Sequence, residues 1–123
     1  MAKFFIGTQE AGWYPLDVYP FNKDVRLKVR SGDEDNLDIV RKKAKENPDF
    51  VAGKITESEA YAQEWADYMI PDWSGVEDET GDVSCTRESK LRALKKGSVF
   101  ANAAMAKSQY HALVKYEEEQ KNS

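Results

Sequence analysis

The order of apolar and polar positions divides the chain into a β-rich beginning and a helical remainder. Residues 1–31 are rich in aromatic and β-branched side chains and are interrupted by glycine and proline, which favours short strands and turns. In the segment 24–30, Val25, Leu27 and Val29 alternate with basic residues. This alternation predicts a half-buried strand with one apolar face and one basic face.

Beyond this segment the apolar positions recur every three or four residues, which is typical of amphipathic helices. The pattern predicts about four helices: one ending at Asn47–Pro48, one from Thr56 to about Met69, one from about Thr86 to Lys96, and one beginning at Val99. Proline disfavours the helical conformation of the residue before it, so the first helix ends there. Thr56 and Glu59 form a capping box, which marks the start of the second helix.

These elements predict an α+β fold that is mainly α. We expect a small N-terminal β element, about four helices, and a short hairpin between the second and third helices. At 123 residues the chain has the length of one domain. We expect a single domain over residues 1–123, with a β-rich part (1–31), a helical part (33–116) and a flexible charged tail (117–123).

Composition narrows the compartments and partners that we expect. Charged residues make up 33% of the chain and the mean hydropathy is -0.73, which indicates a soluble protein without a membrane partner. The single cysteine, Cys85, excludes an intrachain disulfide and suits a reducing cytoplasm. A net charge of -4 gives no overall attraction to nucleic acid, so we expect no nucleic-acid partner.

The stretch MIPDWSGVEDETGDV (69–83) gathers acidic residues that could bind a metal ion. An EF-hand loop requires glycine at its sixth position and glutamate at its twelfth. A loop starting at Asp72 has Glu77 and Val83 there, so the motif fails. A solvated hairpin explains the stretch better, since Val76 and Val83 flank the acidic segment and Gly81 can adopt a positive φ.

Catalytic chemistry has few candidates in this sequence. The single histidine, His111, has no second histidine or cysteine cluster to complete a zinc site, and we expect it to be exposed or partly packed. Cys85 precedes the helix that Thr86 begins, and a helix N-terminus can lower a thiol pKa. A nucleophilic cysteine also needs a positioned base, and His111 lies on another predicted helix. We therefore expect no enzyme, no metal site and no cofactor.

The last predicted helix carries one apolar stripe, formed by Val99, Ala103, Ala106, Tyr110 and Leu113. The small alanines would let another helix approach closely, and the larger side chains near the end could then dock it. Two interpretations stay open, because the stripe could equally belong to the core. In either case the end beyond Leu113 could project and remain available.

With these signals in order, the sequence resembles the tail assembly chaperones of long-tailed bacteriophages. The resemblance covers most of residues 27–116 and is carried by LKVR, RKKA, YAQEWADYMIPDWSGVEDETGDV and FANAAMA. Within the third of these, the family's turn motif W-x-G-V-x-D-x-x-G falls on Trp73, Gly75, Val76, Asp78 and Gly81. Where relatives carry an apolar or proline-containing segment after this turn, the chain has residues 84–87, Ser-Cys-Thr-Arg. The motif implies a structural signature in which the tryptophan anchors a hairpin.

The resemblance implies a non-enzymatic helper that binds the tape measure protein and keeps it soluble while the tail tube assembles. It would act in the host bacterial cytoplasm, as a monomer or homo-oligomer, and be absent from the mature virion. The candidate partner-binding residues are Phe100, Tyr110, Leu113, Val114 and Tyr116.

Members of the family commonly make a second, longer product by ribosomal frameshifting. The resemblance implies that such a longer product could bind the tail tube protein. Gln120-Lys121-Asn122 can be encoded with a slippery A-AAA-AAC run. Two alternative functions remain at this stage. One is a head–tail connector or other structural subunit of the virion. The other is a small regulator that binds nucleic acid through the basic helix 87–96.

Overall fold

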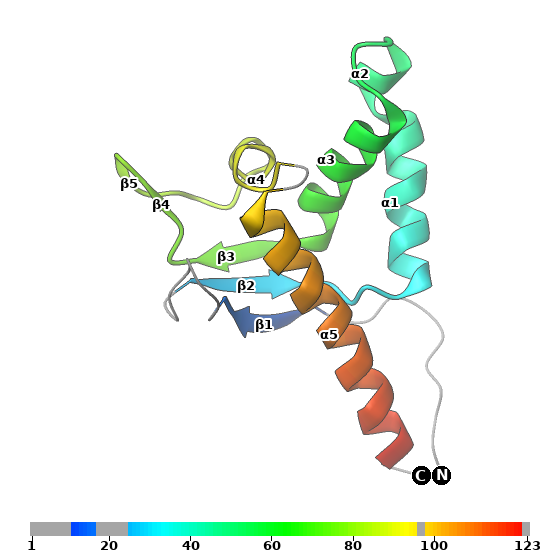
Figure 1. Cartoon of the computed structure of the whole chain (residues 1–123), viewed down its shortest axis with the longest axis vertical. Helices are drawn as coiled ribbons and strands as arrows, with labels where there is room; N and C mark the ends of the chain where they lie inside the picture. The colour runs from blue at the N-terminus through cyan, green and yellow to red at the C-terminus, as the bar shows by residue number, and fades with distance from the viewer. Residues whose placement is uncertain (1–10, 17–24, 96–97, 122–123) are drawn as a thin grey trace.

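The computed structural model describes residues 11–16, 25–95 and 98–121, with the backbone alone for residues 99 and 114–121. The strands are β1 (Gly12–Pro15), β2 (Arg26–Val29), β3 (Asp72–Ser74), β4 (Glu77–Asp78) and β5 (Gly81–Asp82). The helices are α1 (Glu34–Glu46), α2 (Pro48–Val51), α3 (Glu57–Met69), α4 (Arg87–Ala93) and α5 (Val99–Lys121). The fold is therefore α+β and mainly helical, as the sequence predicts (Figure 1).

An antiparallel sheet in the order β1-β2-β3 lies at the centre of the fold (Figure 1). Its register places Tyr14, Leu27 and Trp73 in one row, and this row belongs to the face that α5 covers. The third strand was not expected, because the sequence predicts Trp73 only as the anchor of a hairpin between two helices. Trp73 is also a sheet residue, and pairing with Leu27 on β2 gives it a buried position that local sequence could not indicate.

Helices α1 and α3 pack against each other, and local capping fixes where each begins. The Asp33 carboxylate accepts a hydrogen bond from the Asn36 amide, and the predicted capping box between Thr56 and Glu59 is present. The predicted end of the first helix is also confirmed, since the chain leaves helical geometry at Asn47. The Asn47 side chain then caps α2, a single turn that the sequence pattern did not predict.

The short hairpin expected after the second long helix is confirmed as β4 and β5. The Val83 amide donates to the Val76 carbonyl at 2.9 Å, and Gly81 has a φ of 114° that favours glycine. The indole nitrogen of Trp73 donates to the Val83 carbonyl at 2.8 Å. One tryptophan thus joins the sheet to the base of this hairpin.

The turn of the hairpin is organised by the side chain of Asp78. Its carboxylate accepts hydrogen bonds from the hydroxyl and amide of Thr80, and these bonds lower the pKa of Asp78. Arg92 on α4 donates to the same carboxylate at 2.9 Å. Gly75, just before the hairpin, also has a positive φ, of 76°. The turn is therefore built by local hydrogen bonds and glycine conformations.

Helix α5 crosses one face of the sheet from β3 to β1 (Figure 1). The ring of Phe100 lies 6.1 Å from that of Trp73, centroid to centroid, near the start of the helix. The small side chains of Ala101 and Ala104 are buried, which lets the helix backbone approach the strands closely. Farther along, the Ser108 hydroxyl donates to the Arg30 carbonyl at 2.7 Å.

Helix α5 includes residues 117–121 of the charged segment that the sequence predicts as a tail. The helix continues to Lys121 without interruption. Glutamate, glutamine and lysine are good helix formers, and no glycine or proline stops the helix before them. The C-terminal part of α5 extends beyond the sheet and the α1–α3 pair (Figure 1). No helix in the described part of the chain is long and apolar enough to cross a membrane.

Candidate functional site

The exposed side of α5 differs in charge from the exposed side of α1. Every exposed position of α1 carries a charged side chain: Glu34, Asp35, Asp38, Arg41, Lys42, Lys43, Lys45 and Glu46. From residue 100 to residue 113, the exposed positions of α5 carry none: Asn102, Ala106, Gln109, Tyr110 and Leu113. We call these five residues the uncharged face of α5. Cores of protein interfaces are depleted in charged residues in the same way, so this face is the strongest candidate for a binding surface.

The apolar stripe predicted on the last helix is largely an outward-facing one. Ala106, Tyr110 and Leu113 are exposed, with 54% of Tyr110 and 56% of Leu113 open to solvent. The buried stripe of α5 consists instead of Ala101, Ala104, Ser108 and His111. The interpretation that assigned the whole predicted stripe to the core is therefore wrong for its second half.

The five predicted partner-binding residues fall into three groups in the structure. Tyr110 and Leu113 lie on the uncharged face of α5. Phe100 does not, because it is partly buried with its ring against Trp73. Val114 and Tyr116 belong to α5, but their side chains lie outside the described residues.

The uncharged face is braced against the sheet by Tyr14. The Tyr14 hydroxyl lies 2.6 Å from Nδ1 of His111, and its ring meets that of Tyr110 edge-on at 5.7 Å between centroids. Contrary to expectation, His111 is buried, because Gly12 leaves room for its ring: a Cβ on Gly12 would lie 2.9 Å from the imidazole. Because Gly12 and Tyr14 are far from His111 in the sequence, no local pattern could predict that His111 is buried.

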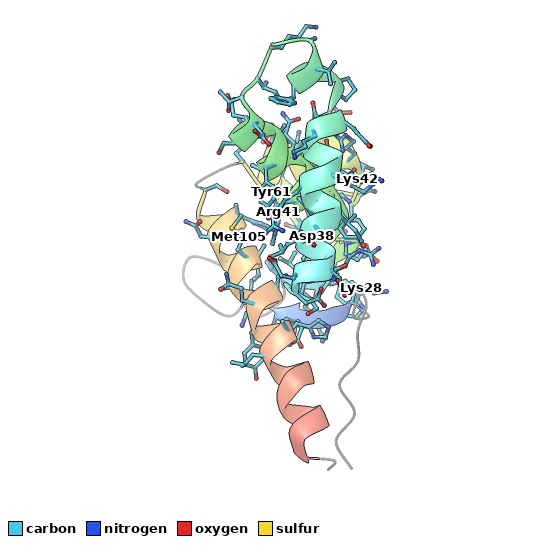
Figure 2. All side chains as sticks on the ribbon, turned by 90° about the vertical axis from the view of Figure 1, so that its right-hand side faces the viewer. Lys28, Asp38, Arg41, Lys42, Tyr61 and Met105 are labelled. Atoms are coloured by element: carbon cyan, nitrogen blue, oxygen red, sulfur yellow. The ribbon has the colours of Figure 1, made fainter. Side chains whose placement is uncertain are left out.

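A groove adjoins the uncharged face where α5 lies beside α1 and α3. Its volume is about 160 Å³, and its lining comes from Gly32, Leu37, Tyr61, Trp65, Met105, Ser108 and Gln109. Figure 2 shows Tyr61, Arg41 and Met105 close together on this side of the molecule. Gln109 belongs both to the groove and to the uncharged face, so the two surfaces are continuous.

The basic side chains of α4, which suggested nucleic-acid binding, are paired with acids of the same chain. Arg87 binds Glu64 at 2.8 Å and Asp67 at 2.6 Å, and Arg92 binds Asp78 at 2.9 Å. These partners neutralise charges that a phosphate backbone would need. The helix therefore uses its described arginines to hold α3 and the hairpin.

The ion pairs between α3 and α4 form a network that includes two buried charged residues, Lys90 and Glu64. The sequence did not indicate that these residues are buried. The Lys90 ammonium donates to the carbonyls of Asp67 and Ile70 at 2.7 and 3.1 Å. The Glu64 carboxylate accepts from Asn47 at 2.7 Å as well as from Arg87. Buried charges persist when paired and hydrogen-bonded in this way.

Asp67 gives the network a testable dependence on pH. Burial alone would raise the pKa of Asp67, but hydrogen bonds from Arg87 and Lys90 outweigh it and hold that pKa below its ordinary value of 3.8. The folded-state pKa of Asp67 is depressed, so its ionised carboxylate stabilises the fold fully at pH values above 3.8. This stabilisation is lost as the pH falls through the folded-state pKa. We therefore expect Asp67→Asn to lower the free energy of unfolding at neutral pH and to flatten its decline in acid.

Urea unfolding followed by circular dichroism across the acidic pH range measures this effect. Asp82→Asn is the matched control, since Asp82 is an exposed aspartate of the hairpin. An identical acid profile for the wild type and Asp67→Asn would contradict the role given to Asp67.

The two other candidates for catalysis, Cys85 and His111, lie in environments that do not favour a nucleophile or a general base. Burial raises the pKa of the Cys85 thiol, which opposes the activation that a helix N-terminus could provide. His111 is engaged with Tyr14, whereas the Cys85 thiol lies 3.9 Å from the Ile70 carbonyl. Within the described ranges, no three histidine, cysteine or acidic residues are grouped so that they could hold a metal ion.

Two further hollows on the described surface are small. Besides the groove, one of about 280 Å³ lies between α3 and α4, and one of about 210 Å³ lies where the chain enters α4. Typical metabolite sites measure roughly 300–1,000 Å³, so these hollows suit side chains better than whole ligands.

Comparison with models of known protein families, with curated proteins and with solved structures finds no match for the chain.

Proposed function

We propose that this protein is a non-enzymatic tail assembly chaperone of a long-tailed bacteriophage, which binds the tape measure protein. The observation that carries the proposal is the uncharged face of α5, which exposes Tyr110 and Leu113, whereas every exposed position of α1 is charged. The resemblance of residues 27–116 to such chaperones supplies the identity of the partner.

The chemistry of this face suits a helical partner. A tape measure protein is a long helical chain whose apolar stripes are exposed until the tail tube surrounds them, and exposed apolar surface promotes aggregation. Ala106 offers a low point where a partner helix can approach α5, while Tyr110 and Leu113 supply larger apolar contacts on either side. Covering a stripe in this way keeps the partner soluble without any chemical reaction.

A binding surface of this size also suits a temporary partner. The described face spans about three helical turns on one element, which is small beside the interfaces of permanent complexes. The chaperone can therefore be displaced by tail tube subunits, acting in the host cytoplasm and leaving before the virion is complete. A longer frameshifted product would add a second segment that contacts the tail tube protein.

Neither alternative function gains a supporting observation. The ion pairs of Arg87 and Arg92 weaken the nucleic-acid interpretation, because those cations already have acidic partners. A connector subunit would remain in purified virions, which distinguishes it from a chaperone.

Co-expression tests the proposal directly. The full chain, expressed in bacteria with the tape measure protein encoded in the same phage genome, should move that protein from the insoluble to the soluble fraction and co-purify with it. Intact virions from the same phage should lack the chain by mass spectrometry. An insoluble tape measure protein in the presence of abundant folded chain, or the chain present stoichiometrically in virions, would contradict the chaperone function.

A further inference from the structure

We propose that the groove between α1, α3 and α5 is a second part of the docking surface, and that it receives one large apolar side chain of the bound amphipathic helix. This inference rests on the proposed function and specifies how the partner is recognised. It assigns a role to Leu37, Tyr61 and Met105, which lie outside the predicted stripe.

The lining of the groove identifies the class of its occupant. Leucine, tyrosine, tryptophan and methionine side chains form its apolar walls, and Trp65 is the most deeply buried of them. Aromatic and thioether side chains adapt well to an inserted apolar group, and such pockets commonly hold the anchor residue of an interface. A volume of about 160 Å³ suits one side chain such as leucine, methionine or phenylalanine.

The position of the groove makes it continuous with the uncharged face. Gln109 belongs to both surfaces, and Met105 lies one helical turn before it on the groove side of α5. A helix that lies along Ala106 and Leu113 therefore has neighbouring positions that point toward the groove. Residues three or four apart on the partner can reach the two surfaces at once.

The charges on the opposite wall give the bound helix a direction. Along this side of α1 the exposed charges are acidic near Gly32, with Glu34 and Asp38, and basic farther on, with Lys45. Arg41 binds both acids, which leaves a net negative charge at the Gly32 end. A partner helix with basic residues at that end and acidic residues near Lys45 complements this order. The occupant is thus an amphipathic helix with one apolar anchor and this charge polarity.

Binding measurements on groove and face variants test the inference. The probe is a set of fluorescently labelled peptides of about 25 residues, long enough for a stable helical segment, tiled along the tape measure protein and titrated with the full chain by fluorescence anisotropy. We expect Met105→Glu to raise the Kd of the best peptide at least about tenfold, with Met105→Ala giving a smaller rise in the same direction. Alanine is a good helix former, so the second variant keeps the test valid if the first unfolds.

A matched pair of charge reversals tests the direction of the bound helix. Arg41 lies beside Tyr61 at the groove, whereas Lys42 points away from it (Figure 2). Lys45 lies one helical turn beyond Arg41 on the same side of α1. Lys45→Glu should therefore weaken binding of a peptide whose acidic residues lie at the Lys45 end, and Lys42→Glu should leave the Kd unchanged. Equal effects of the two reversals would contradict the assigned polarity.

The outcomes separate this inference from the proposed function. If Leu113→Asp weakens binding while both Met105 variants bind like the wild type, the groove is not part of the site and the chaperone function stands. If the wild type binds no peptide and does not solubilise the tape measure protein, both fail. If light scattering shows a dimer of the chain that Met105→Glu dissociates, a second copy occupies the groove and the inference is overturned.

Discussion

Replacing Trp73 with alanine is expected to lower the free energy of unfolding by about 3–5 kcal/mol, as for other large aromatic residues removed from a core. The side chain is only 6% exposed, lies opposite Leu27 in the sheet and meets Phe100 of α5. Its loss also leaves the Val83 carbonyl without the indole donor. For a domain with an ordinary stability of roughly 5–15 kcal/mol, this is a large share of the total.

Urea unfolding followed by circular dichroism measures the loss of free energy of unfolding. Two further variants serve as a control and separate the contribution of packing from that of the hydrogen bond. Trp13→Ala is the control, since Trp13 is 42% exposed and lies on the opposite face of the sheet, and we expect a loss below about 1 kcal/mol. Trp73→Phe retains most of the packing but not the hydrogen bond to Val83, and should cost about 1 kcal/mol for that bond. Equal losses for Trp73→Ala and Trp13→Ala would mean that α5 does not rest on Trp73.

The double variant Tyr110→Asp/Leu113→Asp is expected to weaken tape measure binding more than about a hundredfold while the chain remains folded. Both changes place a charge on the uncharged face of α5, where a docked helix would remove that charge from water. The folded chain loses the edge contact between Tyr110 and Tyr14, worth about 0.5–1.5 kcal/mol, and both side chains are more than half exposed.

Co-purification with the tape measure protein, together with circular dichroism of the variant alone, checks this expectation. The control Lys42→Asp/Lys54→Asp adds the same number of acidic residues at exposed positions outside the groove and should bind like the wild type. Global unfolding of the Tyr110→Asp/Leu113→Asp variant would show that the face belongs to the core. Unchanged binding by a folded variant would place the docking surface elsewhere.

These expectations depend on features that local sequence shows to different degrees. Residues whose structure is fixed by near neighbours were predicted correctly. Thr56 and Glu59 satisfy each other's backbone groups within one turn, and Gly81 allows the hairpin by its own backbone freedom. The strand around Leu27 was also predicted, because alternation is a property of the segment itself.

The candidate site was predicted in part, and the reason lies in the size of the buried residues. Tyr110 and Leu113 were identified as one apolar stripe, but the sequence could not show whether it faces inward or outward. A pattern based on hydrophobicity gives little weight to Ala101, Ala104 and Ser108, which form the buried side of α5. The sheet selects these small side chains because they permit close approach, and Tyr110 and Leu113 then face solvent.

The amino-acid sequence by itself determined the four longer helices, the capping box of Thr56 and Glu59, the central strand and the hairpin, because each depends on interactions between residues only a few positions apart. Only the tertiary structure decided the third strand, the burial of His111 against Tyr14 and the pairing of Arg87 with Glu64. Those contacts join distant segments and are formed by packing, which no local pattern records. The same packing turns α5 so that its uncharged face is available to a partner.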